Sequence, residues 1–485
     1  MEFQGRGLQS TRETLTVKLQ HLEAMFKRVS SLLAIGGVLT LSAPAYSMNL
    51  EEAVALAVED NPRVAAAQAS RRANDYVLKQ ARGRYSPEVE ISASAGYERY
   101  DQLGAFGIEK NFIWRKARKG TVTVRQVLFD GFDRRNGRYQ AQARISASAQ
   151  KIMARAETVA LDAIEAYIDV LRHRRLIVLG TQNVDRHRKL LKLVQERVTG
   201  GKNSVGDLDQ TKERLQAAIA LVSQIKIARD VAAAKFKNAV GVGPGRLQST
   251  KFPKNKFLHS NEAVAAAIEG NFKLAALRHE IDATGFKTEQ FRASLFPVIS
   301  VEGSATRGED LGGSDDRADD LKAMVMLRWK LIDGGVRRNR IHELTEREFV
   351  KIAEYDSMIR DVRQEIEISW SRLMEGGKQV AAKRSQLKET QKVVASYRKE
   401  YEADKRSLLD VLDAENTRFG IEFDLSNAIS IRRFAAYQLM AHTGDLLKTL
   451  NVARPAGAQY EPDISMLRPA SSAKSAFIIP PLKQE

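Results

Sequence analysis

The sequence contains no cysteine, which excludes disulfide scaffolds, zinc fingers and thiol catalysis. Proline is scarce: there are 11 prolines in 485 residues, and the stretches 88–243 and 298–454 have none. Because proline breaks helix interiors and central strands, each stretch can hold long uninterrupted elements. Beyond residue 47, no apolar run reaches the roughly 18 residues that suggest a membrane-spanning helix.

The overall composition excludes two further classes of protein. Hydrophobic residues make up 43% and charged residues 28%, a balance too polar for a bundle of membrane helices and too apolar for a disordered chain. The formal net charge of +17 would suit nucleic acid, anionic lipid or an acidic cargo. No arginine-rich run with interleaved aromatic residues is present, so no nucleic-acid partner is expected.

An export signal is expected within residues 25–47. Lys27 and Arg28 are followed by the short apolar stretch 29–41 and by small residues suited to cleavage near Ala45. Residues 1–24 then read as an upstream extension, so 1–47 is assigned to extension plus signal. The mature chain would be exported without a lipid anchor, because no lipobox cysteine exists.

The chain repeats itself. Residues 52–54 match 262–264 at an offset of 210, and the Leu-x-Asp-Gly motif at 128–131 recurs at 331–334 at an offset of 203. Such self-similarity indicates two units of one architecture. The predicted division is a first repeat at 48–241, a linker at 242–260, a second repeat at 261–450, and a proline-rich, disordered tail at 451–485.

Each repeat is predicted to contain a β-hairpin, at about 88–129 and 298–331. Apolar and polar residues alternate along both, with the second strand of the first hairpin placed near 120–129 and exposed loops at 100–120 and 307–320. Such strands suit an outer-membrane barrel, or equally a half-buried hairpin of a soluble protein. Four strands cannot close a barrel in lipid, so a membrane-spanning chain would have to oligomerise.

Very long helices are predicted after each hairpin. A heptad seam of small and apolar residues runs through about 136–199 and again, in register, through about 339–402. Each helix would extend about 100 Å, enough to cross a periplasm. A turn and a returning helix follow, at about 207–240 and 410–447. The predicted fold class is therefore mainly α with a small β part.

In this order of elements the sequence resembles the TolC family of outer-membrane factors and, within it, the BepC type. The resemblance covers about residues 49–450 and includes the two Leu-x-Asp-Gly elements and the run Asp410-Val411-Leu412-Asp413. It implies a homotrimer in which four strands per chain form a 12-stranded outer-membrane barrel above an α-helical periplasmic tunnel.

The resemblance also implies a function and partners. The chain would passively export drugs, detergents or a type I secreted protein, without enzymatic activity, cofactor or metal. Its partners would be outer-membrane lipid, a periplasmic adaptor (membrane fusion protein) and an inner-membrane RND or ABC transporter.

A gate at the periplasmic tip follows from the same resemblance. Tyr401 and Arg406 match positions that link the inner helix pair to the outer pair, and Asp207 matches an acceptor on the outer pair. One departure stands out, because the first tip turn has Gly200-Gly201 whereas the second has Ala403-Asp404. The tip turn is the part that the adaptor grips in the family, so the choice of adaptor stays open.

The resemblance assigns Asp410 and Asp413 to a constricting acidic ring. Residues three apart share a helix face, so three chains would aim six carboxylates at one axis. A simpler reading remains open for Asp410 and Asp207, because Ser407 and Ser204 stand three residues before them, as in a capping box at a helix start.

Another class of function competes with the duct. A periplasmic coiled-coil adaptor or scaffold of an envelope assembly would also combine long helices with small β-elements. The two readings differ in whether the apolar face of the strands is covered by the protein's own core. An enzyme finds no support, since no nucleophile–base motif, metal cluster or cofactor loop emerges from the sequence.

Overall fold

The computed structural model describes residues 47–99, 114–311 and 316–460. The chain divides into two units, Met1–Ser47 and Met48–Glu485, and the account below concerns the second. The predicted extension and signal before Ser47, part of each predicted hairpin loop and the tail from 461 onward lie outside the described residues.

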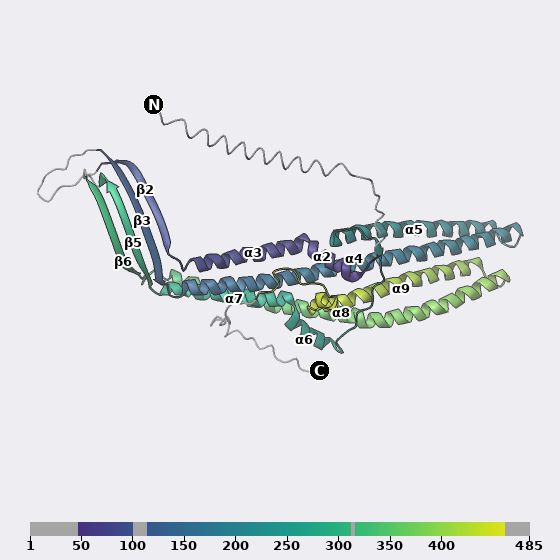
Figure 1. The fold of residues 1–485 in the computed structure, drawn as a ribbon. Helices are drawn as coiled ribbons and strands as arrows, with labels where there is room; N and C mark the ends of the chain where they lie inside the picture. Colours follow the sequence, from purple (N-terminus) through teal and green to yellow (C-terminus); the bar gives the residue numbers. More distant parts are fainter. Residues whose placement is uncertain (1–46, 100–113, 312–315, 461–485) are drawn as a thin grey trace, which may run out of the picture. The chain divides into compact units, whose positions relative to one another are not determined.

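Both repeats run through the same order of elements (Figure 1). The first contains α2 (Leu50–Asp60), α3 (Pro62–Gly83), β2 (Glu88–Glu98), β3 (Arg115–Phe129), α4 (Asp133–Thr199) and α5 (Val205–Val240). The second contains α6 (Ser260–Gly270), α7 (Phe272–Arg292), the 3₁₀ helix η1 (Ala293–Leu295), β5 (Val298–Glu309), β6 (Arg317–Arg328), α8 (Val336–Glu402), α9 (Leu408–His442) and α10 (Leu446–Thr449). Short strands β1 (Ser47–Met48) and β4 (Arg246–Leu247) complete the described elements.

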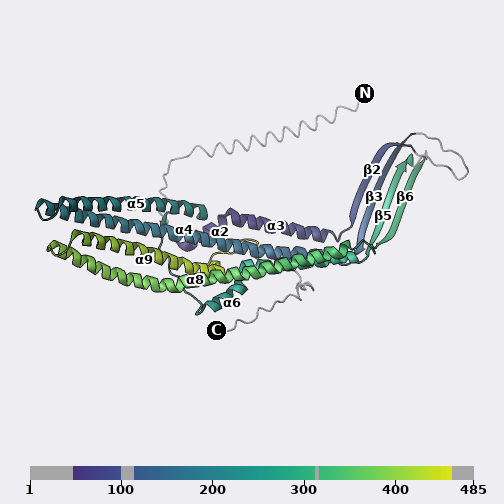
Figure 2. The same cartoon turned by 180° about the vertical axis from the view of Figure 1, so that it is seen from behind.

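The helices begin and end where local chemistry favours it. Asn49 makes a capping box with Glu52 at the start of α2, and Asn61 caps α3 just before a proline in its first turn. The long helices α4 and α8 begin three residues earlier than predicted, and each has 67 residues, or about 100 Å. Figure 2 shows α5 beside the C-terminal part of α4 and α9 beside the C-terminal part of α8.

The predicted end of the last returning helix, at 447, is wrong. The helix α9 stops at His442, and Gly444 follows with φ of +76°, a conformation that glycine adopts without strain. The backbone of Gly270 lies so close that a Cβ at Gly444 would meet the Gly270 oxygen at 2.2 Å. This close approach turns the chain, and α10 is a separate helix.

The four hairpin strands form one antiparallel sheet in the order β2-β3-β5-β6, and the short strands β1 and β4 pair with each other. The hairpin strands reach farther into the predicted loops than expected: Arg115 pairs with Glu98, and Arg307 pairs with Asp319. The loop predictions are therefore wrong for 115–120, 307–309 and 317–320. Charged side chains did not end these strands, because backbone pairing needs no apolar residue on an exposed face.

The apolar face of this sheet has no core of its own. Ile91 is 76% exposed and Val325 is 70% exposed, and no described residue covers the apolar side chains between them. The reading of these strands as half-buried hairpins of a soluble protein is therefore not supported. An uncovered apolar face of this kind is suited to lipid contact.

The two Leu-x-Asp-Gly motifs build the corners between sheet and long helix. Asp130 accepts hydrogen bonds from the backbone and side chain of Arg134, at 3.2 and 2.6 Å, and Arg134 also donates to the Val127 carbonyl. Asp333 and Arg337 repeat this arrangement with the same two distances. The motif thus fastens the last residues of each hairpin to the first turn of the following helix.

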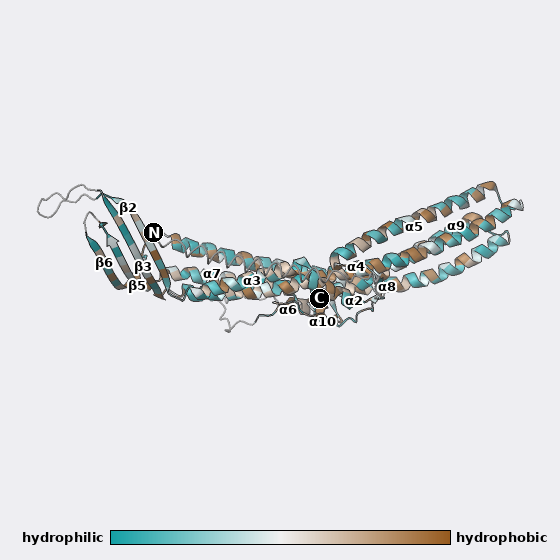
Figure 3. Cartoon of the chain, turned by 45° about the horizontal axis from the view of Figure 1, so that its top comes forward, coloured by the Kyte–Doolittle hydropathy of each residue, from teal (hydrophilic) through white to brown (hydrophobic). Residues whose placement is uncertain are grey.

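Figure 3 shows hydrophilic and hydrophobic residues interleaved along α4, α5, α8 and α9. Among the described residues, no helix combines the length and the hydrophobicity needed to cross a membrane.

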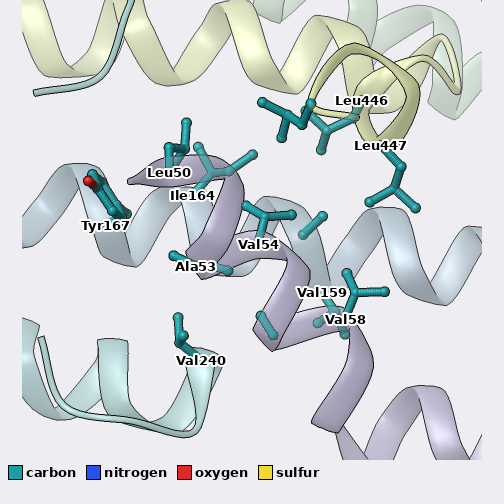
Figure 4. Close-up of a cluster of buried hydrophobic side chains, with 14 of the residues drawn as sticks. Leu50, Ala53, Val54, Val58, Val159, Ile164, Tyr167, Val240, Leu446 and Leu447 are labelled. Carbon is teal, nitrogen blue, oxygen red and sulfur yellow. The ribbon is translucent and has the colours of Figure 1, made fainter. Parts of the chain in front are cut away.

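The largest buried cluster joins the first repeat to the end of the second (Figure 4). It holds side chains of α2, α4, α5 and α10; examples are Leu50, Val54, Val159, Ile164, Val240, Leu446 and Leu447. The Tyr167 hydroxyl lies 2.9 Å from the Met48 carbonyl and 2.8 Å from the Gln248 carbonyl, which holds the predicted linker against α4. The linker is therefore packed against the helices.

The beginning of the predicted tail is also packed. Ala458 belongs to the same buried cluster, and Arg71 lies over the ring of Tyr460 at 5.2 Å. The prediction of a disordered tail is therefore wrong for residues 451–460. The whole tail 451–485 is rich in proline, but residues 451–460 contain only Pro455, and the side chains of Val452, Ala458 and Tyr460 pack against the helices.

A buried carboxylate in this region makes stability depend on pH. Glu157 of α4 accepts a hydrogen bond from the Leu447 amide at 3.3 Å, and burial raises its pKa from 4.5 to about 8. The folded state therefore holds a proton that the unfolded chain releases above pH 4.5. The contribution of protonated Glu157 to the free energy of unfolding is complete below pH 4.5 and is lost as the pH rises to about 8.

Glu157→Gln should remove this dependence, because glutamine keeps the shape and stays neutral. At pH 8.5 we expect the variant to unfold at a higher temperature than the parent, because its free energy of unfolding is larger by on the order of a few kcal/mol. Near pH 4.5 we expect both proteins to unfold at a similar temperature. Thermal unfolding followed by circular dichroism checks this. Glu165→Gln, on an exposed position of the same helix, is the control, and an equal pH profile for all three proteins would contradict the assignment.

Candidate functional site at the helical turns

The two turns that join α4 to α5 and α8 to α9 have the same backbone. The Gly200 amide bonds to the Glu196 carbonyl at 3.0 Å, and the Ala403 amide bonds to the Lys399 carbonyl at 3.1 Å. The next residue is left-handed in both, with φ of +73° at Gly201 and +58° at Asp404. Glycine adopts this conformation freely, and aspartate is among the few other residues that tolerate it.

Asp404 occupies this position in contact with the other repeat. Its carboxylate forms an ion pair with Arg197, near the end of α4, and lies 3.9 Å from the Lys202 ammonium. The Arg197 side chain is only 11% exposed and also donates to the Glu402 carbonyl at 3.3 Å. The substitution of glycine by aspartate in the second turn therefore creates a charged link between the two helical hairpins.

The link continues into the first turn. Arg197 donates to the Asn203 side chain at 2.8 Å, and Asn203 donates to Asp207 at 2.9 Å. This hydrogen bond from Asn203 lowers the pKa of the Asp207 carboxyl, which stays ionised at neutral pH. A continuous chain of polar contacts thus runs from Asp404 through Arg197 and Asn203 to Asp207.

Tyr401 lies buried beneath this chain of contacts. Its ring packs in a cluster of both hairpins with Leu190, Val194, Leu408, Val411 and Leu412. The Arg197 guanidinium lies 4.7 Å from the ring centre, within the range of a cation–π contact. Burial raises the pKa of the Tyr401 hydroxyl, which lies beside Asn203 and Arg197 without a well-formed hydrogen bond within the described part of the chain.

Arg406 contacts residues of its own hairpin. Its guanidinium bonds to Glu400 at 2.9 Å, stacks over the Tyr397 ring at 4.1 Å and lies 3.8 Å from Asp410. The hydrogen bond to Glu400 raises the pKa of Arg406. None of the contacts found for Arg406 in the described residues joins it to Asp207, so the single chain does not form that predicted pair.

Both predicted capping contacts are present. Ser204 and Asp207 form a complete capping box at the start of α5. At the start of α9 the Asp410 amide donates to the Ser407 hydroxyl at 3.2 Å, and this hydroxyl donates to the Asp410 carboxylate at 2.8 Å. Asp410 is half-buried and Asp413 is exposed, one turn farther along the helix.

The sequence singled out Tyr401 and Asp207, and the structure brings them near each other through Arg197 and Asn203. Those two mediators were missed, as was the partner role of Asp404. The signal was present in part, because Asp404 stands 203 residues after Gly201, at a position that prefers glycine. The identity of its partner could not be read, since Arg197 lies in the other repeat.

Comparisons with known proteins agree with this architecture. The model of the family described as "Outer membrane efflux protein" matches residues 53–242 and 263–445. The chain belongs to the outer membrane efflux protein family. It is an outer-membrane protein that extends into the periplasm, in a non-enzymatic transport family whose members form trimeric channels and work with adaptors and inner-membrane transporters.

Individual family members are distant in sequence and close in fold. The outer membrane efflux protein BepC of Brucella suis is 23% identical over 441 residues, covering 90% of this chain and 93% of BepC. The alkaline protease secretion protein AprF of Pseudomonas aeruginosa is 22% identical over 410 residues, covering 81% of this chain and 83% of AprF. The crystal structure of the outer membrane protein VceC of Vibrio cholerae matches with a TM-score of 0.69 at 16% identity, covering 84% of this chain and 97% of VceC.

Membership in this family decides between the two competing readings of the sequence. The chain contributes four strands to a 12-stranded barrel and its long helices to a helical tunnel, as the resemblance implied. The alternative of a periplasmic coiled-coil adaptor or scaffold is not favoured.

The Arg197 link yields a prediction about the stability of the two turns. Arg197→Met keeps an unbranched side chain over the Tyr401 ring and removes the contacts to Asp404 and Asn203. We expect a loss of about 1 kcal/mol, which corresponds to about fivefold faster amide exchange in residues 196–208 and 399–411.

Hydrogen exchange followed by mass spectrometry checks this prediction. Arg188→Met on the same helix is the matched control, since Arg188 is exposed and pairs with Asp185 at 3.2 Å. Equal exchange at the turns in both variants would show that Arg197 does not hold the hairpins together.

Proposed function

We propose that this protein is a passive exit duct that carries small molecules, a type I secreted protein, or both, out of the cell, and that it is gated at the two helical turns. The main support is a sheet with an uncovered apolar face that leads, through two corners, into helices of about 100 Å. One end of this arrangement suits lipid, and the other reaches across the space beneath the membrane.

The proposed latch uses Tyr401, Arg406 and Asp207. In a single chain the Tyr401 hydroxyl is buried without a well-formed hydrogen bond in the described region, and Arg406 keeps to its own hairpin. The Tyr401 hydroxyl is therefore placed to link the inner hairpin to Asn203 and Asp207 of the outer hairpin, and Arg406, which is partly exposed, is free to reach an acceptor on an outer hairpin. The Asp404–Arg197 link would hold the two hairpins of each copy while such contacts open and close.

The proposed acidic ring uses Asp410 and Asp413. Three copies would bring six carboxylates near one axis, which favours cations and repels anions. Arg406 lies 3.8 Å from Asp410, so part of this charge is balanced within each chain. The capping contacts of Asp410 are compatible with this role, because they orient its carboxylate at the start of α9.

The proposed partners follow from the family. A periplasmic adaptor would dock at the helical turns, and an inner-membrane transporter of the RND or ABC type would supply the energy. BepC is named an efflux protein and AprF a protease secretion protein, so relatives of both kinds are similar to this chain. Deleting the gene and comparing drug sensitivity with the set of secreted proteins distinguishes the two kinds of cargo.

The duct and its latch can be tested together in planar lipid bilayers. We expect the parent protein to form channels of low conductance, and Tyr401→Phe with Arg406→Ser to raise the single-channel conductance severalfold, because the closed turns lose the links between the inner and outer helix pairs. Tyr355→Phe with Arg360→Ser, away from the turns on the same helix, is the control. A parent that forms no channels would contradict the duct, and an unchanged conductance of the double variant would contradict the latch.

The acidic ring is tested by cation block in the same bilayers. We expect Asp410→Ala with Asp413→Ala to weaken block by a trivalent cation about tenfold, which corresponds to about 1.4 kcal/mol of binding. Asp209→Ala with Glu213→Ala removes the same charge from the start of α5 and should leave block unchanged. Equal block in both double variants would remove the ring assignment.

A further inference from the structure

Closure of the trimeric barrel brings β6 of one copy beside β2 of the next, and we infer that these two strands pair in the register that β3 and β5 already show within the chain. This inference rests on the trimeric assembly in the proposed function and deepens it, since it states which residues meet at the seam between copies.

The argument begins with the equivalence of the two hairpins. Val89 pairs with Val124, and their counterparts Ile299 and Leu327 pair with each other. The offsets of 210 for the first strand and 203 for the second hold along both hairpins, since Glu98 pairs with Arg115 and Gly308 pairs with Ala318. The two hairpins therefore have the same strand register.

The chain contains one junction between such hairpins, the pairing of β3 with β5. In this junction Thr123 lies opposite Ser304. If copies join in the same way, β6 takes the place of β3 and β2 takes the place of β5. The same offsets then place Met326 opposite Ser94 of the partner subunit.

The outer edge of β6 stops short in a way that a partner would explain. The β3 strand continues through Gln126–Phe129, beyond its pairing with β2, because these residues pair with β5. The counterparts at 329–332 are not in a strand, and the apolar side chains of Leu331 and Ile332 are 70% and 90% exposed. Residues 329–332 therefore lack strand structure at the positions whose counterparts in β3 pair with a neighbouring strand.

This segment is already held in position for pairing. The Trp329 indole donates to the Leu295 carbonyl at 3.1 Å. Its counterpart Gln126 donates to the Tyr85 carbonyl, the counterpart of Leu295, at 3.2 Å. The same tether therefore precedes a paired strand end in one repeat and an unpaired strand end in the other.

Charges support the register. It places Lys322 opposite Glu98 of the partner subunit and Lys330 opposite Glu90 of the partner subunit. The junction within the chain also has ion pairs across it, Arg118 with Glu309 at 3.7 Å and Arg125 with Glu302 at 3.2 Å. A slip of one residue would turn the apolar face of one strand to the polar side. A slip of two residues that moves Lys322 to Gly96 of the partner subunit would keep two pairs of opposite charge, Arg328 with Glu90 of the partner subunit and Lys330 with Glu88 of the partner subunit. It would also set Asp320 opposite Glu98 of the partner subunit, and like charges directly opposite destabilise a strand pair.

Disulfide crosslinking tests this register directly, because the chain has no cysteine of its own. Ser94→Cys with Met326→Cys should form covalent dimers and trimers on oxidation of the membrane-embedded protein, since directly opposite Cβ atoms lie about 4.5–5.5 Å apart. Thr123→Cys with Ser304→Cys, the equivalent pair within the chain, is the positive control. Ser92→Cys with Met326→Cys and Ser94→Cys with Met324→Cys, each shifted by two residues, should lose the crosslink.

The outcomes separate the register from the assembly. Stronger crosslinking of a shifted pair would overturn the inferred register and leave the trimer intact. The same conclusion would follow if no pair between copies formed a crosslink while a lysine-reactive reagent still linked trimers. A parent protein that remains a monomer in the membrane would overturn the proposed assembly as well.

A charge exchange provides a second measurement that does not depend on disulfide geometry. Glu98→Lys or Lys322→Glu alone should lower the temperature at which the trimer dissociates in detergent, and the two together should restore most of it. Failure of the double variant to recover stability beyond the single variants would overturn the Lys322–Glu98 pairing.

Discussion

Backbone hydrogen bonding at the edges of a sheet is the constraint on which this protein depends. In lipid, an unpaired amide or carbonyl costs several kcal/mol, so a membrane-embedded sheet must close on itself. This chain supplies four strands, with the outer edges of β2 and β6 unpaired in the described residues. The need to pair those two edges makes assembly a condition of folding in the membrane.

The internal duplication supplies equivalent parts for a closed barrel. Each repeat supplies one hairpin, one corner and one long helix, and the same contacts recur in both, from the Asp130–Arg134 pair to the Asp333–Arg337 pair. A junction that works between two repeats of one chain can work again between chains. With the inferred register, the closed ring would have a single kind of strand junction, and the corners would connect it to the helices.

The helical turns show where the repeats have diverged. The backbone of both turns is the same, yet Asp404 replaces glycine and pairs with Arg197 of the other hairpin. An acidic residue in the left-handed conformation stands there beside a nearly buried arginine. The divergence gives the turns a polar connection that identical repeats would lack, at the end of the molecule where opening would be regulated.

The sequence by itself determined the order of hairpin, long helix and returning helix in each repeat, and the bounds of the two long helices to within three residues. The absence of proline, the alternation along the strands, the heptad seam and the two offsets are local or periodic signals, and periodicity reports directly which side chains share a face. Tertiary structure decided the extent of the strands beyond their apolar residues, the end of α9 at the close approach of Gly270 and Gly444, and the Arg197–Asp404 link. These depend on contacts between residues far apart in sequence, and no local pattern specifies such a partner.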